Sequence, residues 1–304
     1  MRSVNIKVIL LLFSTALLFC CKGGKSKNPR KITADDKYLY QDIARDTLFP
    51  ATIEEITYTS GGARIYGFGY LANGEGPHAT IILVHANPGN ERNLDLAQNL
   101  RRAGVNVFYF DYRGSWGSEG TYTYANCIED TRSVVGFVTN PDNALRLRVD
   151  IGNIFLVGHN LGAGIGMIEG LNDPRVRGVA AVSLVNPYTT FRGENAELNF
   201  SDMNEYFETL GMLKMDSKTF LLDIVAKLPE YNIEKMVSDA TKPVLVIDEQ
   251  HNNEFLKKYT SKKNVEYEFW DTDLEFSDKR IALTRRLKEW LDKNKGMGKR
   301  VKKP

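Results

Sequence analysis

The sequence predicts an α/β fold in which a mostly parallel central sheet carries helices on both faces. Short continuous apolar runs recur along the chain, which is the pattern of strands buried on both faces of a parallel sheet. Amphipathic helical segments separate these runs, and such alternation of strand and helix favours this fold class. The composition is that of a globular protein, because 42% of the 304 residues are hydrophobic and 26% are charged.

The strands begin with an N-terminal hairpin. Ile53–Thr59 and Arg64–Leu71 alternate in polarity on either side of a Ser-Gly-Gly turn, so they predict two antiparallel strands. The remaining strands are predicted at the apolar runs Ile81–Val84, Val105–Phe110, Ile154–Val157, Val179–Val185, Val244–Ile247 and Val265–Trp270.

The helices are predicted from apolar residues at helical spacing. One such face comprises Leu96, Ala97, Leu100 and Ala103, and another comprises Leu283, Leu287, Trp290 and Leu291. The helical stretch Tyr124–Phe137 contains Cys127, which is expected to be a buried apolar residue.

One interval breaks the alternation. Residues 187–240 contain no convincing strand, only helical pieces at Phe207–Leu213 and Phe220–Leu228. We therefore expect a helical cap inserted between the sixth and seventh strands and lying over the strand ends. Its aromatic residues either line a ligand cleft or pack the cap itself: Tyr188, Tyr206, Phe207 and Tyr231.

Residues 1–21 have the layout of an export signal. Arg2 and Lys7 precede the apolar run Val8–Cys21, which is too short to span a bilayer comfortably. The end of the run resembles a bacterial lipoprotein signal, with Cys21, or alternatively Cys20, as the lipidated residue. A plain secretory signal and an uncleaved anchor are the other interpretations. The resemblance implies a lipid-anchored protein of the bacterial cell envelope, facing the periplasm or the exterior.

The rest of the chain divides by composition. Residues 22–51 are expected to form a tether and lead-in, 52–292 the folded domain, and 293–304 a basic tail. A net charge of +2 gives no electrostatic footprint for nucleic acid. Neither zinc-type Cys/His spacing nor a phosphate-binding loop motif occurs, so no metal and no cofactor are predicted.

The sequence Gly158-His159-Asn160-Leu161-Gly162 follows a buried strand and opens a helix. A strand, a sharp turn and a helix, with glycines flanking the central residue, form the context of a nucleophile elbow. The glycines are needed because strand and helix pack closely around a strained central residue.

Two further loops follow predicted strands. The first begins at His85, and its backbone amide at Ala86 or Asn87 could pair with that of Leu161 to form an oxyanion hole. The second is the glycine-rich segment 111–120 that follows the next strand.

With these motifs, residues 52–292 resemble the α/β-hydrolase superfamily, in its bacterial serine esterase or peptidase-like branch. The segments that carry the resemblance are PGNERNLDLAQ (88–98), DYRGSWGSEG (111–120) and FSDKRIALTRRLKEWL (276–291). The resemblance implies a serine at the elbow, an acid after the penultimate strand and a histidine in the loop after the last strand.

This chain departs from that pattern at each position. The elbow residue is Asn160, whose amide is a poor nucleophile, and Leu274 stands where the histidine is expected. His251 or Asn252 occupies the usual place of the acid, because Asp248 lies too close to the strand end. The four histidines are His78, His85, His159 and His251, so no general base can follow residue 251.

Several residues allow both a functional and a structural interpretation. His251 is expected to be a surface histidine, although it could have taken a catalytic role. Residues at the positions of His85 and His159 usually face the packing behind such a site. Asp111 and Arg113 could bind a ligand, although a structural loop pair is favoured. The candidates for a ligand cleft are His85, Asp111, Arg113 and Tyr188.

The sequence therefore predicts a membrane-tethered protein of hydrolase fold that is catalytically inactive and binds a small molecule or peptide in the old cleft. The alternative is an esterase or peptidase that uses residues outside the family positions, for instance Ser115 or Ser118. Asparagine tolerates positive φ, so we expect the elbow turn to survive at Asn160.

Overall fold

The structure is a computed structural model, and it describes residues 36–298. The predicted signal, both candidate lipidation sites, residues 22–35 of the tether and lead-in, and the last six residues lie outside this range. No helix within the described range is long and apolar enough to cross a membrane.

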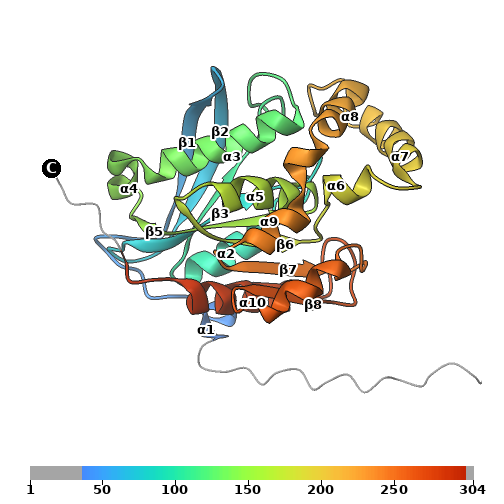
Figure 1. Cartoon of the computed structure of the whole chain (residues 1–304). Coiled ribbons are helices and arrows are strands. Elements are labelled where there is room, and N and C mark those ends of the chain that lie inside the picture. The colour runs from blue at the N-terminus through green and yellow to red at the C-terminus, as the bar shows by residue number, and fades with distance from the viewer. Residues whose placement is uncertain (1–35, 299–304) are drawn as a thin grey trace, which may run out of the picture. The chain divides into compact units, whose positions relative to one another are not determined.

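The strands form an eight-stranded sheet in the order β1-β2-β4-β3-β5-β6-β7-β8 (Figure 1). The β1–β2 and β2–β4 pairs are antiparallel, and the other five pairs are parallel, which confirms the predicted fold class. The strands are β1 (Thr52–Ser60), β2 (Ala63–Leu71), β3 (His78–Val84), β4 (Asn106–Phe110), β5 (Val149–His159), β6 (Val176–Val182), β7 (Val244–Asp248) and β8 (Val265–Phe269).

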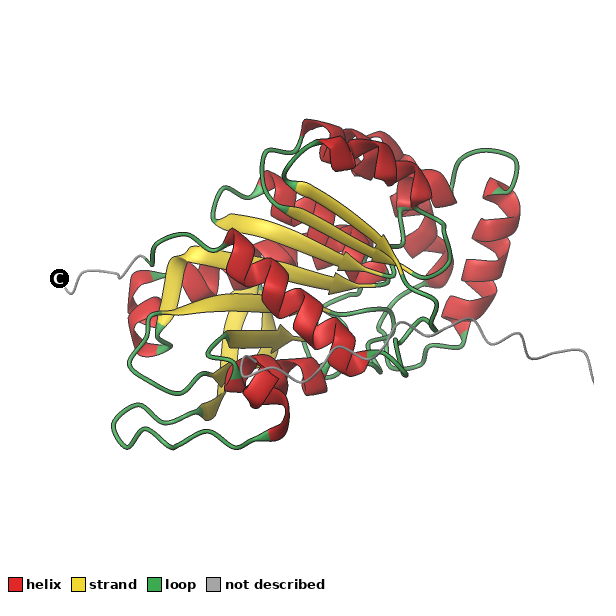
Figure 2. Ribbon diagram, turned by 90° about the horizontal axis from the view of Figure 1, so that it is seen from below, coloured by secondary structure: helices red, strands yellow, loops and turns green. Residues whose placement is uncertain are grey.

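Helices cover both faces of the twisted sheet (Figure 2). One face carries α3 (Tyr124–Thr139), α4 (Pro141–Arg146), α5 (Leu161–Asn172) and α9 (Ile233–Asp239). The other carries α2 (Leu94–Arg102) and α10 (Arg280–Asn294), whose predicted apolar faces are buried except for the half-buried Ala103. A short helix, α1 (Lys37–Tyr40), precedes the sheet.

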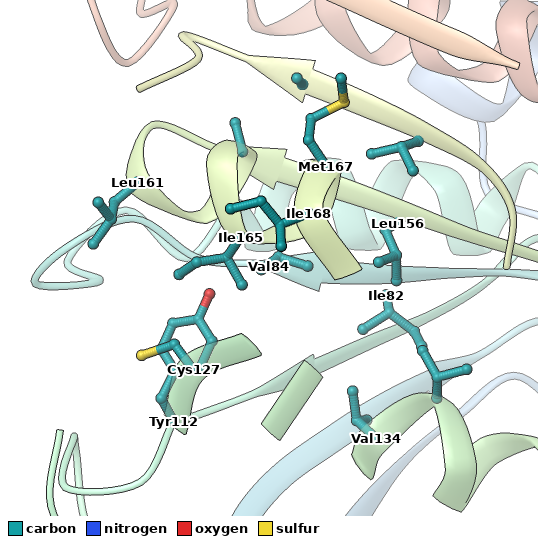
Figure 3. Packing of buried hydrophobic residues seen from close by; sticks show 14 of the residues in the cluster. Ile82, Val84, Tyr112, Cys127, Val134, Leu156, Leu161, Ile165, Met167 and Ile168 are labelled. Atoms are coloured by element: carbon teal, nitrogen blue, oxygen red, sulfur yellow. The ribbon is translucent and has the colours of Figure 1, made fainter. Parts of the chain in front are cut away.

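Alternation along each strand divides the core into two layers. In β3, Ile82 and Val84 face the α5 side, whereas Ile81 and Leu83 face the α2 side. Figure 3 shows part of the α5 layer, where Ile165 and Ile168 belong to the same cluster as Val84. Cys127 is fully buried in this layer, as predicted.

The cap comprises the helical segments between β6 and β7. They are α6 (Pro187–Thr190), α7 (Ala196–Glu208), α8 (Ser217–Ala226), the 3-10 helix η2 (Leu228–Tyr231) and α9. In Figure 1, α7 and α8 stand at the end of the sheet toward which the parallel strands run. A further 3-10 helix, η3 (Glu254–Ser261), lies between β7 and β8.

The helix predicted at Phe207–Leu213 is wrong, because α7 ends at Glu208. A series of turns buries Phe207, Leu210 and Leu213, and it brings Leu213 into an isolated bridge with Ser115. The Lys214 amide then donates to the Gly114 carbonyl at 2.7 Å. The apolar residues at helical spacing therefore belong to a loop that is hydrogen-bonded to the body of the domain.

Candidate functional site: a hydrolase-type elbow without its triad

The elbow turn forms as the sequence predicts, with Asn160 between β5 and α5. Its φ is +53°, in the expected positive range, but its ψ is −119°. This ψ lies outside the left-handed helical region that asparagine tolerates well, so the residue is strained. Three backbone hydrogen bonds hold it. The Asn160 amide donates to the Val182 carbonyl (2.9 Å), and the Asn160 carbonyl accepts from the amides of Ala163 (3.0 Å) and Val185 (3.2 Å).

The flanking glycines permit a close approach of backbones. A Cβ atom on Gly158 would lie 2.3 Å from the Gly162 carbonyl oxygen, and one on Gly162 would lie 2.1 Å from the Val84 carbonyl oxygen. Both distances are shorter than any real Cβ contact. The first turn of α5 therefore packs directly against β5 and the end of β3, as the motif predicts.

This packing brings Leu161 beside the loop that follows β3. The amide of Leu161 opens α5 and so has no acceptor within the helix. The amides of Ala86 and Asn87 donate no hydrogen bond to another group among the described residues. Both side-chain polar atoms of Asn87 are also buried without a partner. The amides of Ala86 and Asn87 are therefore without an acceptor among the described residues, and the elbow residue nearby is Asn160.

Leu274 occupies the loop between β8 and α10, and it reaches the site through its backbone. Its carbonyl oxygen accepts a hydrogen bond from His159 Nε2 at 2.8 Å and lies 3.2 Å from Ser183 Oγ. Burial lowers the pKa of His159. The loop between β8 and α10 therefore lies beside the ends of β5 and β6, where a catalytic histidine would be expected. The residue at that position is Leu274, which has an aliphatic side chain.

The two carboxylates at the end of β7 form hydrogen bonds to neighbouring groups. Asp248 is buried at the strand end, where its Oδ2 accepts hydrogen bonds from the Asn253 amide and the Tyr267 hydroxyl, both at 2.9 Å. Glu249 accepts a hydrogen bond of 2.8 Å from Ser183 Oγ, and burial raises its pKa. Ser183 and Glu249 therefore link the ends of β6 and β7 to the Leu274 loop.

The sequence analysis missed the link between Ser183 and Glu249. The two residues are 66 positions apart, and neither belongs to a motif. The one local signal is the position of Ser183 directly after a buried strand. Its φ of +51° is unusual for serine.

His251 and Asn252 lie on the outside of the same loop. The His251 ring stacks on Phe269 with the ring centroids 3.6 Å apart, and its Nδ1 lies 3.5 Å from the carboxylate of Glu254. Asn252 donates to the side chain of Gln250 at 3.1 Å. Half of the His251 side chain is exposed, in agreement with the surface interpretation.

His85 is fully buried behind the oxyanion-type loop. Its Nδ1 donates to the Ala86 carbonyl at 2.7 Å, and its ring packs on Tyr112 with a centroid separation of 4.2 Å. Burial lowers the pKa of His85 to about 4, so the ring is neutral at physiological pH. It packs the site from behind and is not positioned as a ligand-binding cation.

Asp111 is also buried, and it pairs with groups other than Arg113. Its Oδ1 accepts a hydrogen bond of 2.9 Å from the Tyr109 hydroxyl and lies 3.6 Å from the guanidinium of Arg92. Arg92, which the sequence analysis did not single out, lies over the rings of Tyr109 and Trp116. Burial raises the pKa of Asp111 to about 6, although the charge of Arg92 acts to lower it.

This pKa predicts a pH-dependent effect of Asp111→Asn. Because the folded pKa exceeds the unfolded value, the folded state binds more protons between about pH 4 and 6, and the carboxylate costs stability above that range. The variant keeps an acceptor for Tyr109. We expect it to match the natural chain near pH 4 and to gain up to about 3 kcal/mol near pH 8, less any loss of the Arg92 contact. Urea unfolding at the two pH values measures the difference.

The matched control for this prediction is Asp223→Asn, at an exposed position of α8. It should change the unfolding free energy by a similar small amount at both pH values. A difference at Asp111 that does not vary with pH would contradict the prediction.

Arg113 serves the loop structure. Its Nε and its backbone amide each donate to the buried carboxylate of Asp130 at 2.7 Å, and it also pairs with Glu129 at 2.6 Å. Ser115 and Ser118 are buried and donate to backbone carbonyls at 2.8 Å. All three side chains therefore form hydrogen bonds that hold the 111–120 loop in place.

The cap aromatics divide between packing and surface. Phe207 and Tyr231 are buried, with Phe207 near Phe220 of α8 in the cap and Tyr231 edge-on to Tyr124 of α3. Tyr206 is exposed, whereas Tyr188 is half-buried and its hydroxyl accepts a hydrogen bond from Arg192. Two of the four thus pack the cap, and Tyr188 remains beside the strand ends.

Among residues 36–298, no group of three or more His, Cys, Asp or Glu side chains is arranged to hold a metal ion. No family model matches the chain.

The chain is similar to known proteins at two levels. The uncharacterized protein YfhR of Salmonella typhimurium is 32% identical over 152 residues, which is 47% of this chain and 50% of the relative. The match thus spans about half the length of this curated relative.

Solved structures match over a larger part of the chain. The esterase Pf2001 of Pyrococcus furiosus aligns with a TM-score of 0.58 at 17% identity, over 81% of this chain and 92% of that one. Est1E of Butyrivibrio proteoclasticus, in its structure with ferulic acid, aligns with a TM-score of 0.62 at 16% identity, over 79% and 98%. The sheet order, the elbow and these neighbours agree: the chain has the α/β-hydrolase fold.

Proposed function

We propose that this protein is a non-catalytic member of the hydrolase fold, which holds a small molecule or peptide in the cleft under its cap. Serine-type hydrolysis needs a nucleophile, a base that takes its proton and a group that orients the base. The elbow carries Asn160, whose carboxamide cannot lose a proton near neutral pH.

The observation that carries the proposal is the engagement of all four histidines elsewhere. His78, His85 and His159 each form hydrogen bonds to backbone carbonyls. His251 is stacked on Phe269 at the surface. The loop between β8 and α10, where the base is expected, carries Leu274 and no histidine, while the strained turn and the free amides around it are retained.

We also propose that the N-terminal signal anchors the protein by lipid at Cys21 to a bacterial envelope membrane. The support is the positive, apolar and cysteine layout of residues 1–21. Incorporation of labelled palmitate by the natural chain, and its loss in Cys21→Ala, would test the anchor.

The catalytic part of the proposal is tested with the full chain in detergent. We expect no turnover of short-chain p-nitrophenyl esters or aminoacyl amides above the rate in buffer, and no fluorophosphonate adduct at any serine. Asn160→Ser alone should remain inactive, because it restores a nucleophile without a base. The triple variant Asn160→Ser, Leu274→His, Asn252→Asp should gain activity if the old geometry persists.

Two outcomes would contradict the proposal. Turnover by the natural chain that Asn160→Ala abolishes would make residue 160 catalytic. Turnover that Asn160→Ala leaves unchanged, together with an adduct on Ser115 or Ser118, would favour the alternative of an esterase with displaced residues. Melting temperatures of the natural chain with each ester and amide measure binding without turnover.

A further inference from the structure

The backbone of Asn160 brings the amide of the next residue toward the Asn160 side chain. In an L-residue, Cβ is rotated from N by about 120° around the Cα–C bond, so the torsion from Cβ to the next nitrogen is ψ plus about 120°. The ψ of Asn160 is −119°, which makes this torsion close to zero. The Leu161 nitrogen therefore eclipses Cβ of Asn160, and rotation about χ1 brings the carboxamide carbon, Cγ, toward it.

The asparagines that flank other helices lack this geometry. Their ψ lies between 6° and 132°, which turns the next nitrogen more than about 100° away from Cβ. They are Asn93, Asn140, Asn186, Asn195, Asn232 and Asn253. In a regular helix or strand the same torsion is about +78° or −105°. The eclipsed arrangement is therefore a property of the elbow turn.

The two groups that face each other at the elbow are free of hydrogen bonds to residues 36–298. The Leu161 amide has no acceptor there, and the Asn160 carboxamide neither caps α5 nor bonds elsewhere. The three backbone hydrogen bonds of Asn160 hold its ψ in place. Asn160 is half-buried, so solvent water reaches it, whereas Leu161 is buried.

We propose that Asn160 is a modification site, at which the Leu161 amide attacks the carboxamide and closes a succinimide ring. The Leu161 nitrogen forms a bond to Cγ and passes its proton through water to Nδ2, while the Cγ–Nδ2 bond breaks and ammonia leaves. A water molecule then opens the ring at either of its two carbonyl carbons. The products are aspartate and isoaspartate at residue 160.

Ring closure fits the hydrogen bonds of the elbow. It removes the amide proton of Leu161 and the Nδ2 atom of Asn160, neither of which bonds to a described residue. It keeps the backbone carbonyl of Asn160, which accepts from Ala163 and Val185. A folded chain that already holds the reacting groups together avoids most of the entropy that a flexible chain loses in reaching this arrangement.

Asn73 is the matched control within the same chain. It is the one asparagine that a glycine follows, and glycine hinders the attack least, so Asn73 is expected to react fastest in the unfolded chain. In the folded protein the Gly74 amide donates to the Phe49 carbonyl at 2.8 Å. The Asp46 amide also donates to Oδ1 of Asn73 at 2.9 Å. Folding should therefore slow the reaction at Asn73 and speed it at Asn160.

The test incubates the full chain in detergent at mildly alkaline pH, in water enriched in heavy oxygen, once folded and once in concentrated urea. Peptide mass spectrometry with electron-transfer fragmentation measures the labelled aspartate and isoaspartate at each position. In the folded chain we expect Asn160 to convert about tenfold faster than Asn73, and in urea we expect the order to reverse.

Two variants locate the reaction. The longer side chain of Asn160→Gln would need a larger ring, which closes more slowly, so this variant should lose the gain of negative charge that ion-exchange chromatography detects on incubation. Asn73→Gln should leave the rate at Asn160 unchanged. The comparison of folded and unfolded natural chain requires neither variant, so it decides even if Asn160→Gln fails to fold.

Two outcomes would overturn the inference. One is a rate at Asn160 that is no higher in the folded chain than in urea, and the other is faster conversion at Asn73 than at Asn160 in the folded chain. The inference goes beyond the proposed function and does not rest on it. Ester turnover by fresh protein that depends on Asn160 would overturn the non-catalytic assignment and leave the modification site standing.

Discussion

Gly162→Ala is expected to lower the free energy of unfolding by about 3 kcal/mol or more, and so to leave little folded protein. The new methyl group would lie 2.1 Å from the Val84 carbonyl oxygen and 2.3 Å from that of His85. Both are backbone atoms at the end of a central strand, so neither can rotate away as a side chain would. Urea unfolding followed by circular dichroism measures the loss.

The same helix provides the control for this prediction. A Cβ on Gly166 would have its nearest neighbour, a Val84 methyl group, at 3.8 Å, which is an ordinary contact. Gly166→Ala should therefore stabilise the protein by about 0.5 to 1 kcal/mol, because alanine favours the helix. A Gly162→Ala variant as stable as the natural chain would show that α5 can move away from β3.

Removal of Asp130 is the second change with a large expected effect. Its side chain is fully buried, and its carboxylate accepts both the Nε and the backbone amide of Arg113, whose side chain is 7% exposed. Asp130→Ala would leave the buried guanidinium with the half-exposed Glu129 as its one charged partner, beside the Asn126 carbonyl at 3.2 Å. We expect a loss of about 3 to 5 kcal/mol, since the cost of a buried charge is then only partly offset.

Two companion variants test that explanation. Glu129→Ala removes the more exposed partner, whose side chain is 48% exposed, and should cost less than about 1 kcal/mol. The double variant Arg113→Ala, Asp130→Ala should cost less than the sum of the single variants, because no unpaired charge remains. Strict additivity would mean that the pair contributes no coupling.

The fold could be predicted because its signals are local. Continuous apolar runs mark the buried strands, and the glycines around Asn160 mark a turn that few other residues allow. The sequence analysis placed the start of strand β5 too late, because Asp150 and Asn153 interrupt the apolar run from which the strand was predicted. These two polar residues are buried and bond to each other at 2.7 Å, a pairing that periodicity does not reveal.

The candidate site could be predicted in part. Residue identity and chain order alone place an asparagine at the elbow and no histidine after residue 251. The hydrogen bonds between the loops around the elbow could not be predicted. Their partners lie far apart in the sequence, 66 residues for Glu249 and Ser183 and 69 residues for Asn253 and Leu184. The sequence also could not separate the cap aromatics that are buried from those that are not, because all of them are aromatic.

The hydrogen bonds of the two buried site histidines fix opposite tautomers. A carbonyl oxygen only accepts, so His159 carries its proton on Nε2 toward Leu274, whereas His85 carries its proton on Nδ1 toward Ala86. The remaining nitrogens, Nδ1 of His159 and Nε2 of His85, are buried without a partner among residues 36–298. Neither ring can pass a proton onward without first breaking its bond to the backbone.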